Sequence, residues 1–196
     1  MKPFTTLTSI VAPILRDNID TDTIIPSREM KSTGRTGLAG GLFAPWRYTE
    51  GRTPDPAFAL NQLEFADAQV IAAGANFGCG SSREHAVWAL AEWGIRAVIA
   101  SSFAPIFAAN CLRNGLLTVS LPSEVISALA GKHVSIDLEA QTVDCTGHEW
   151  HFDIDEEAKA MLLEGLDAID LTLKSLPQIE MWTAQDRASR PWVYLT

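Results

Sequence analysis

Three short apolar segments, separated by two segments with helical periodicity, constrain the fold of this chain more than any other feature. Residues 68–73, 96–101 and 116–121 are rich in the aliphatic and β-branched side chains of buried strands. The segments between them carry apolar residues at helical spacing, the first ending at Gly94 and the second running from residue 105 to residue 113. Because strand–helix–strand connections are right-handed and join parallel strands, the sequence predicts an α/β fold with a parallel core sheet.

The chain on either side of this core predicts further strands and helices. A strand is expected at residues 8–15, near an edge of the sheet because Pro13 lacks a backbone N–H group. The second half predicts a short helix, three alternating antiparallel strands and a helix that Asp155 caps, at residues 123–130, 133–138, 142–145, 149–154 and 155–165. Residues from about 177 onward are expected to form an irregular tail. We therefore expect residues 1–196 to form one domain, with a largely parallel core sheet and an added antiparallel layer.

A glycine-rich connection, residues 74–86, joins the first core strand to its helix. It contains Ser81-Ser82-Arg83-Glu84, which has the spacing of a capping box with Ser81 as the N-cap. A helix N-terminus has unpaired backbone N–H groups and about half a positive charge, so it attracts anions. Arg83 lies where helices prefer acidic residues, and its guanidinium is suited to binding a carboxylate or phosphate. The connection is therefore predicted to be an anion site with two hydroxyl groups.

Other glycine-rich and serine motifs fit this connection poorly. A dinucleotide fingerprint would need glycine at the position of Arg83, and a P-loop would need Gly-Lys followed by Ser or Thr. A Ser–His pair stays open because His85 lies one turn from the serines, although a structural role for this histidine is favoured.

Two loop regions nearer the N-terminus carry further candidate residues. Residues 17–26 are acidic and resemble part of a calcium loop, but they lack the glycine and the distal glutamate of an EF-hand. Side chains that cap their own backbone are therefore favoured over a metal site. Residues 30–41 are polar and glycine-rich, with Arg35 between the glycines, and loops of this kind are often functional.

Composition excludes several classes of function. The net charge of −9 argues against non-specific binding to nucleic acid or to anionic membranes, and no apolar run approaches the ~20 residues of a membrane span. Cys79, Cys111 and Cys145 are odd in number and widely spaced, which indicates reduced thiols in a cytoplasmic protein. They also lack the close spacing of a self-contained zinc or iron–sulfur site, so no metal is expected on this chain.

These residues also carry a resemblance to a known family. One segment resembles the signature of the mobile C-terminal domain of the aconitase superfamily: Asn76-Phe77-Gly78-Cys79-Gly80-Ser81-Ser82-Arg83-Glu84-His85-Ala86. A second segment resembles the N-terminal motif of that domain: Asp20-Thr21-Asp22-Thr23-Ile24-Ile25-Pro26. Four further segments resemble the family of bacterial 3-isopropylmalate dehydratase small subunits: Arg35-Thr36-Gly37, Leu42-Phe43, Trp46-Arg47 and Gly165–Leu173. The likeness spans nearly the whole chain and implies a swivelling β/β/α domain.

The resemblance implies an activity and a role for several residues. The activity is the isomerisation of 2-isopropylmalate and 3-isopropylmalate through isopropylmaleate, in leucine biosynthesis, with a separate large subunit that holds a [4Fe–4S] cluster. Ser81 would be the general base, and Ser82, Arg83 and Arg35 would bind the carboxylates of the dicarboxylate substrate. Asp22 falls where the superfamily keeps an active-site carboxylate, although backbone capping explains it nearly as well.

Two alternatives stay open at this point. One is the small subunit of a related hydro-lyase that acts on methylmalate, dimethylmalate or homoaconitate. The other is a non-catalytic anion-binding module. A cluster-bearing partner would favour an enzyme, and the lack of such a partner would favour the module.

Overall fold

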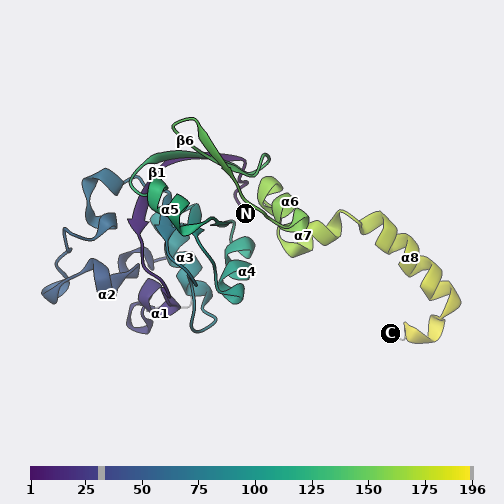
Figure 1. Cartoon of the computed structure of the whole chain (residues 1–196). Helices are drawn as coiled ribbons and strands as arrows, with labels where there is room; N and C mark the ends of the chain where they lie inside the picture. Colours follow the sequence, from purple (N-terminus) through teal and green to yellow (C-terminus); the bar gives the residue numbers. More distant parts are fainter. Residues whose placement is uncertain (31–33, 195–196) are drawn as a thin grey trace.

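A mixed seven-stranded sheet forms the centre of the computed structural model, which describes residues 1–30 and 34–194 (Figure 1). Its order is β4-β3-β2-β1-β5-β6-β7, and the strands from β4 to β1 are parallel while those from β1 to β7 are antiparallel. The strands are β1 (Thr6–Ile14), β2 (Val70–Ala73), β3 (Ala97–Ala100), β4 (Leu117–Ser120), β5 (His133–Asp137), β6 (Thr142–Cys145) and β7 (His148–His151). The predicted α/β fold with a parallel core is confirmed.

Helices cover both faces of the parallel half of this sheet. The longer ones near the sheet are α3 (Glu84–Trp93), α4 (Pro105–Arg113), α5 (Ser123–Leu129) and α6 (Glu156–Glu164), and the short ones are α1 (Thr21–Ile24) and α2 (Ala44–Arg47). Alternate strand residues face opposite sides, so Ile71 packs with α3 and α4 whereas Val70 packs with α5. Single-turn 3-10 helices lie at Ser27–Glu29, Ala39–Gly41, Glu50–Arg52, Ala59–Asn61, Leu63–Phe65 and Pro191–Val193.

The antiparallel strands continue the same sheet and curl over one of its faces. The register aligns Val11, Val70, Ala97 and Leu117 in one row across the parallel half. This row belongs to the same apolar cluster as Val134 and other residues of β5 and β6. The predicted antiparallel layer is thus an extension of the core sheet, and β1 joins the two halves.

The predicted position of the first strand at a sheet edge is wrong, because β1 lies between β2 and β5. The N–H and C=O groups of Val11 bond to Lys132 and Gly131, on the β5 side. Pro13 is two residues further along, so its nitrogen faces the same side, beyond the Ile10–His133 pair where β5 begins. A residue without an N–H group is tolerated here because β5 does not extend along Pro13 on this side, while β2 pairs with the other side of the strand.

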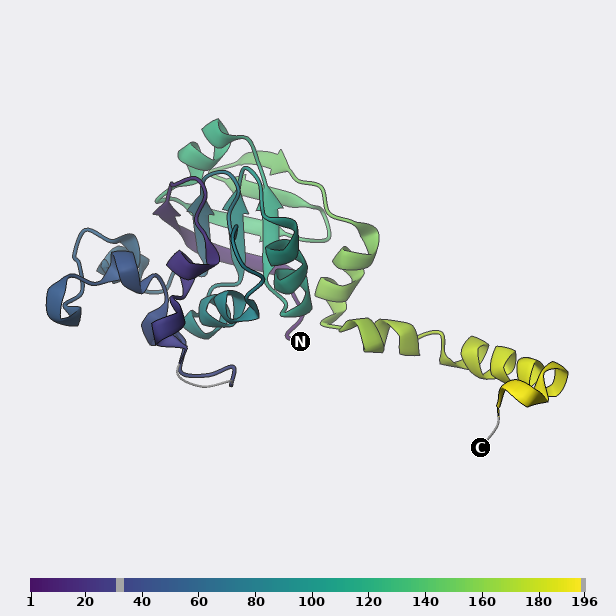
Figure 2. The ribbon, with the colours of Figure 1, turned by 90° about the horizontal axis from the view of Figure 1, so that it is seen from below.

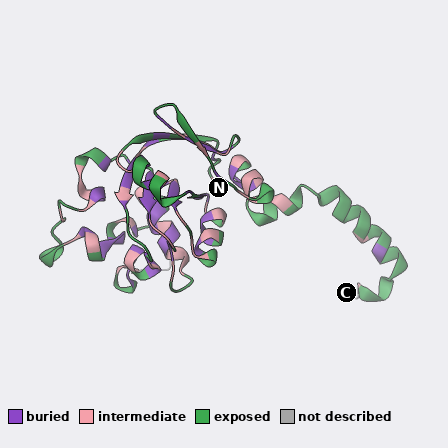
Figure 3. Cartoon of the chain, viewed as in Figure 1, coloured by how far each residue is buried: buried purple, intermediate pink, exposed green. Residues whose placement is uncertain are grey.

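The prediction of an irregular C-terminal tail is also wrong. The chain continues from α6 into α7 (Ala168–Leu173) and then into α8 (Leu176–Ser189), which form an arm extending away from the sheet on the side opposite α2 (Figures 1 and 2). The arm is mostly exposed, whereas the buried residues gather between the sheet and its helices (Figure 3). No helix in the described residues is long and apolar enough to cross a membrane.

Candidate active site

The glycine-rich connection lies at the carboxyl ends of the central parallel strands. It is held between the segments that follow β1 and β3, since the N–H of Gly78 bonds to the carbonyl of Ile19 at 2.7 Å and the N–H of Phe77 to that of Ser102 at 3.0 Å. A further bond joins the N–H of Thr21 to the carbonyl of Cys79 at 2.9 Å. Open α/β sheets bind ligands at this end of their strands. The fold therefore places the predicted anion site where a ligand is expected.

Gly78 fixes how closely the connection packs against α4. Its φ of +77° is unfavourable for other residues, and a Cβ atom here would lie 2.1 Å from Cγ of Phe107. Only glycine allows the backbone to lie flat against this ring. The loop that follows is thereby held against the N-terminus of α4.

The predicted capping box is not formed. Helix α3 begins at Glu84 with Arg83 at the N-cap position and no side-chain capping bond, so Ser81 lies outside the helix. Glu84 instead accepts a hydrogen bond from Nδ2 of Asn114 at 2.9 Å. The backbone N–H groups of residues 80–83 have no acceptor among the described residues, so the loop itself still offers donors to an anion.

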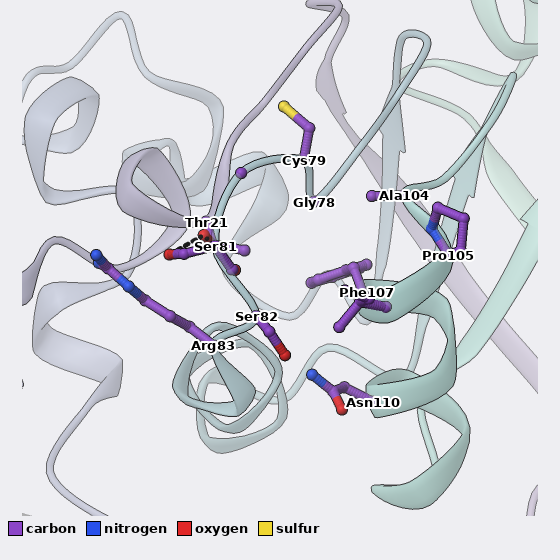
Figure 4. Close-up of a pocket in the computed structure, with 12 residues that line it drawn as sticks. Thr21, Gly78, Cys79, Ser81, Ser82, Arg83, Ala104, Pro105, Phe107 and Asn110 are labelled. Carbon is purple, nitrogen blue, oxygen red and sulfur yellow. Dashed lines mark hydrogen bonds between the residues drawn. The ribbon is translucent and has the colours of Figure 1, made fainter.

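The serines of this loop point in different directions (Figure 4). Ser81 is exposed and faces Thr21, whose Oγ1 donates to the carbonyl of Ser81 at 3.0 Å and lies 3.4 Å from its Oγ. Ser82 points to the other side, toward Asn110 of α4 (Figure 4). The hydroxyl groups of Ser81 and Ser82 therefore lie on opposite sides of the loop.

Arg83 lies on the Ser81 side and forms an ion pair with Asp22. Its Nη1 contacts Oδ1 of Asp22 and donates to Oγ of Ser27 at 3.0 Å. Backbone capping in this segment is carried out by Asp20, whose carboxylate accepts from the N–H of Thr23 at 2.6 Å. The structure thus brings two predicted site residues, Asp22 and Arg83, into contact.

A pocket lies on the other side of the loop, between it and α4. Its volume is about 200 Å³, and its walls come from Thr21, residues 78–83, residues 104–107 and Asn110. Asn110 is 6% exposed, and its amide faces this pocket (Figure 4). The described residues contain no group of three or more His, Cys, Asp or Glu side chains that could hold a metal ion.

Arg35 lies over α3 rather than against the glycine-rich loop. Its guanidinium carbon is 5.2 Å from the ring centroid of Trp88, and the His85 ring lies tilted against the same indole with 4.7 Å between ring centroids. The neighbouring residues Gly37, Leu38 and Ala39 donate their backbone N–H groups to the carboxylate of Glu92, at 2.6, 2.5 and 2.8 Å. Residues 31–33 of the predicted loop lie outside the described residues.

Glu92 is the residue that ties the Arg35 loop to α3. Its hydrogen bond from the backbone of Gly37, together with those from Ala39 and Leu38, holds the pKa of this carboxyl below its usual value. A lowered folded pKa stabilises the contact above the unfolded pKa of about 4.3, and the contact is lost as the pH falls through the folded value. The anchor is therefore complete at neutral pH.

We expect Glu92→Gln to free this loop without unfolding the protein. The amide has one acceptor oxygen instead of two and carries no charge, so hydrogen exchange at the amides of residues 37–39 should become about tenfold faster at pH 7. Glu64→Gln is a matched control, because Glu64 has no polar partner in residues 1–30 and 34–194. Equal exchange rates in the Glu92 variant and the wild type would contradict the anchor.

Three residues of the site region were not predicted from the sequence: Thr21, Glu92 and Asn110. Each contacts or faces a segment more than 25 residues away, and no local motif marks such a partner. The cysteines show no catalytic arrangement in the described residues. Cys111 and Cys145 are buried, and burial raises the pKa of the Cys111 thiol well above its usual value.

Fold and loop together define an aconitase-type C-terminal domain. The model of the aconitase C-terminal domain family matches residues 1–124, and a second model, LeuD_N, matches residues 124–156. Among solved structures, 3-isopropylmalate dehydratase from Methanocaldococcus jannaschii aligns with a TM-score of 0.70 at 30% identity, over 90% of this chain and 99% of that chain.

Curated relatives identify the branch of this superfamily. The 3-isopropylmalate dehydratase small subunit of Cupriavidus necator is 52% identical over 99% of both chains. The small subunit of Methylorubrum populi is 48% identical over 98% of this chain and its own full length. The chain belongs to the family of 3-isopropylmalate dehydratase small subunits.

Proposed function

We propose that this chain is the small subunit of a 3-isopropylmalate dehydratase, a hydro-lyase that interconverts 2-isopropylmalate and 3-isopropylmalate through isopropylmaleate in leucine biosynthesis. What carries the proposal is identity of 45–52% to proteins of that name along the whole chain, together with the loop at residues 76–86. The enzyme would work in the cytoplasm with a separate large subunit.

The reaction removes a hydroxyl group and, from the adjacent carbon, a proton, and then adds water back in the opposite sense. We assign the proton to Ser81, whose hydroxyl is exposed beside Thr21 and next to backbone N–H groups with no acceptor in the described part of the chain. Such donors and the cation of Arg83 favour the alkoxide form that a serine base requires. Ser81 would then return the proton during rehydration.

The substrate is a dianion, so the site needs two sets of donors. We assign one carboxylate to Arg83, whose Nε and Nη2 have no partner among the described residues. Ser82 lies on the other side of the loop and is available for the second carboxylate (Figure 4). Arg35 would reach the substrate from its loop over α3, where its charge is 5.2 Å from the Trp88 ring.

The departing hydroxyl requires a Lewis acid, which this proposal assigns to a [4Fe–4S] cluster on the large subunit. The residues of this chain do not fit such a group, since the two buried cysteines and the half-buried Cys79 lie in separate parts of the fold. The chain would therefore contribute proton transfer and substrate binding only.

The proposal is tested by assembling the chain with the large subunit of the same organism under anaerobic conditions. The complex should convert 2-isopropylmalate, and the chain alone should show neither dehydratase activity nor iron–sulfur absorbance after reconstitution. Methylmalate, dimethylmalate and homoaconitate serve as competing substrates. Faster turnover of one of these would assign the chain to a related hydro-lyase, and binding of dicarboxylates without turnover would leave only an anion-binding module.

A further inference from the structure

The pocket beside α4 contains a buried polar side chain that has no partner. Asn110 is only 6% exposed, and its side chain makes no hydrogen bond within the described residues. Its amide nitrogen points into the pocket toward the hydroxyl of Ser82 (Figure 4). Solvent still reaches this amide through the pocket, because no fully buried side-chain nitrogen or oxygen of the described residues lacks a partner. A mostly buried amide that is free and opens only on a cavity is available to a ligand.

Several hydrogen-bond donors without acceptors lie around Asn110. Helix α4 starts at Pro105 with no side-chain cap, and the N–H groups of Ile106 and Phe107 have no acceptor in the described part of the chain. The hydroxyl of Ser82 likewise has no hydrogen-bond partner among the described residues and can donate. A helix N-terminus also favours negative charge. A ligand group that only accepts hydrogen bonds, such as a carboxylate, therefore fits this pocket.

Ion binding alone does not explain the shape of the pocket. One wall is apolar and is formed by Ala104, Pro105, Ile106 and Phe107. Ile106 is one of these lining residues and is 55% exposed, which is high for a large apolar side chain. The pocket thus offers a polar end for a carboxylate and an apolar surface for the carbon chain that carries it.

We propose that Asn110 and Ser82 together bind one carboxylate of the substrate, on the opposite side of the loop from Arg83, an inference that rests on the proposed function. Asn110 then determines substrate affinity by direct contact, and Ile106 lies along the alkyl part. In this arrangement the two substrate carboxylates bind on opposite sides of one loop. Ser81, which lies next to Arg83, then transfers the proton.

Steady-state kinetics of the assembled complex test this assignment. Asn110→Asp keeps the size of the side chain but adds a like charge, and it should raise the KM for 2-isopropylmalate by about 100-fold with kcat within threefold of wild type. Asn110→Ser is the second variant, in case the buried charge prevents folding, and should raise KM about 10- to 100-fold. The KM of the Asn110→Asp complex should fall toward that of the wild type between about pH 8 and pH 5, because the new carboxyl takes up a proton.

Asn61→Asp is the matched control. Nδ2 of Asn61 donates to the carbonyls of Arg47 and Asp55 at 2.7 and 2.8 Å, so this change should lower the melting temperature and leave KM unchanged. Wild-type KM values in both Asn110 variants, with an active wild-type complex, would overturn the carboxylate site alone. A wild-type complex that does not convert 2-isopropylmalate would overturn the proposed function, and this inference with it.

Discussion

Replacing Ser81 with alanine should lower kcat of the assembled complex about 10²- to 10⁴-fold and leave the melting temperature unchanged. A general base contributes about this much to a rate, and substrate affinity should be largely kept because other residues bind the carboxylates. Stability should not change, because Ser81 is exposed and its nearest side-chain contact is Oγ1 of Thr21 at 3.4 Å. Calorimetry and anaerobic kinetics on the same preparations give both readings.

The structure supplies the control that separates a base from a helix cap. Asp155 caps α6, since its carboxylate accepts from the N–H groups of Glu157 at 3.0 Å and Ala158 at 3.2 Å. Asp155→Ala should therefore lower stability by about 1 kcal/mol, or about 2–4 °C in melting temperature, with kcat unchanged. Near-normal turnover in Ser81→Ala would show that another group takes the proton.

Helix and strand positions in the core were predictable because they depend on local patterns. The apolar run at Val70–Ala73 and the stop at Gly94 follow from periodicity and from glycine's access to positive φ, and the structure has both. The helix from Asp155 to Gly165 was predicted from a local capping signal in the same way. The two helix ends are set by hydrogen bonds within a few residues. The strand pairs with the distant β1 and β3, but its apolar run marks it as buried whatever its partners are.

The wrong predictions concern residues whose partners lie far away in the sequence. Pro13 was assigned to an edge because its missing N–H suggested no neighbour, yet what matters is that β5 begins opposite Ile10. Ser81 was assigned to a cap from spacing alone, but a contact with Thr21, 60 residues earlier, holds it outside the helix. Helix α8 was missed because its exposed apolar residues, Leu176, Ile179, Met181 and Trp182, do not gather on one face.

In the candidate site, too, the features that depend on local sequence were predictable and the contacts between distant residues were not. Its location in the connection at residues 74–86 was predicted from the glycines, serines and arginine of that stretch, because these residue types suit an anion on local grounds. The pairing of Arg83 with Asp22, 61 residues apart, was not predicted. Nor was Asn110, which reaches the pocket from a helix after the next strand. The assignment of Ser81, Ser82, Arg83, Arg35 and Asp22 to catalysis or substrate binding remains a prediction.

The ion pair gives Arg83 a defined orientation. Nη1 is held by Asp22 and Ser27, and the opposite edge of the guanidinium, Nε and Nη2, has no partner within residues 1–30 and 34–194. That edge presents two parallel N–H donors, the arrangement that binds a carboxylate at both oxygens. Asp22 would then act on the substrate through Arg83, as a positioning residue.

Arg83→Lys should therefore be nearly as damaging as Arg83→Ala, with kcat/KM lowered about 10- to 100-fold in each, since charged hydrogen bonds contribute about 1.5–3 kcal/mol. Lysine keeps the charge, but its single ammonium group cannot be held by Asp22 and also present two parallel donors. Arg52→Lys is the matched control, because Arg52 donates to Glu29 with Nη1 at 2.9 Å and Nη2 at 3.1 Å, outside the pocket walls.

Asp22→Asn should lower kcat/KM less than either Arg83 change, and its effect should largely disappear in the Arg83→Ala background, because the two residues act as a unit. If lysine restores most of the activity, Arg83 supplies charge alone, and the two-point grip on the carboxylate is wrong.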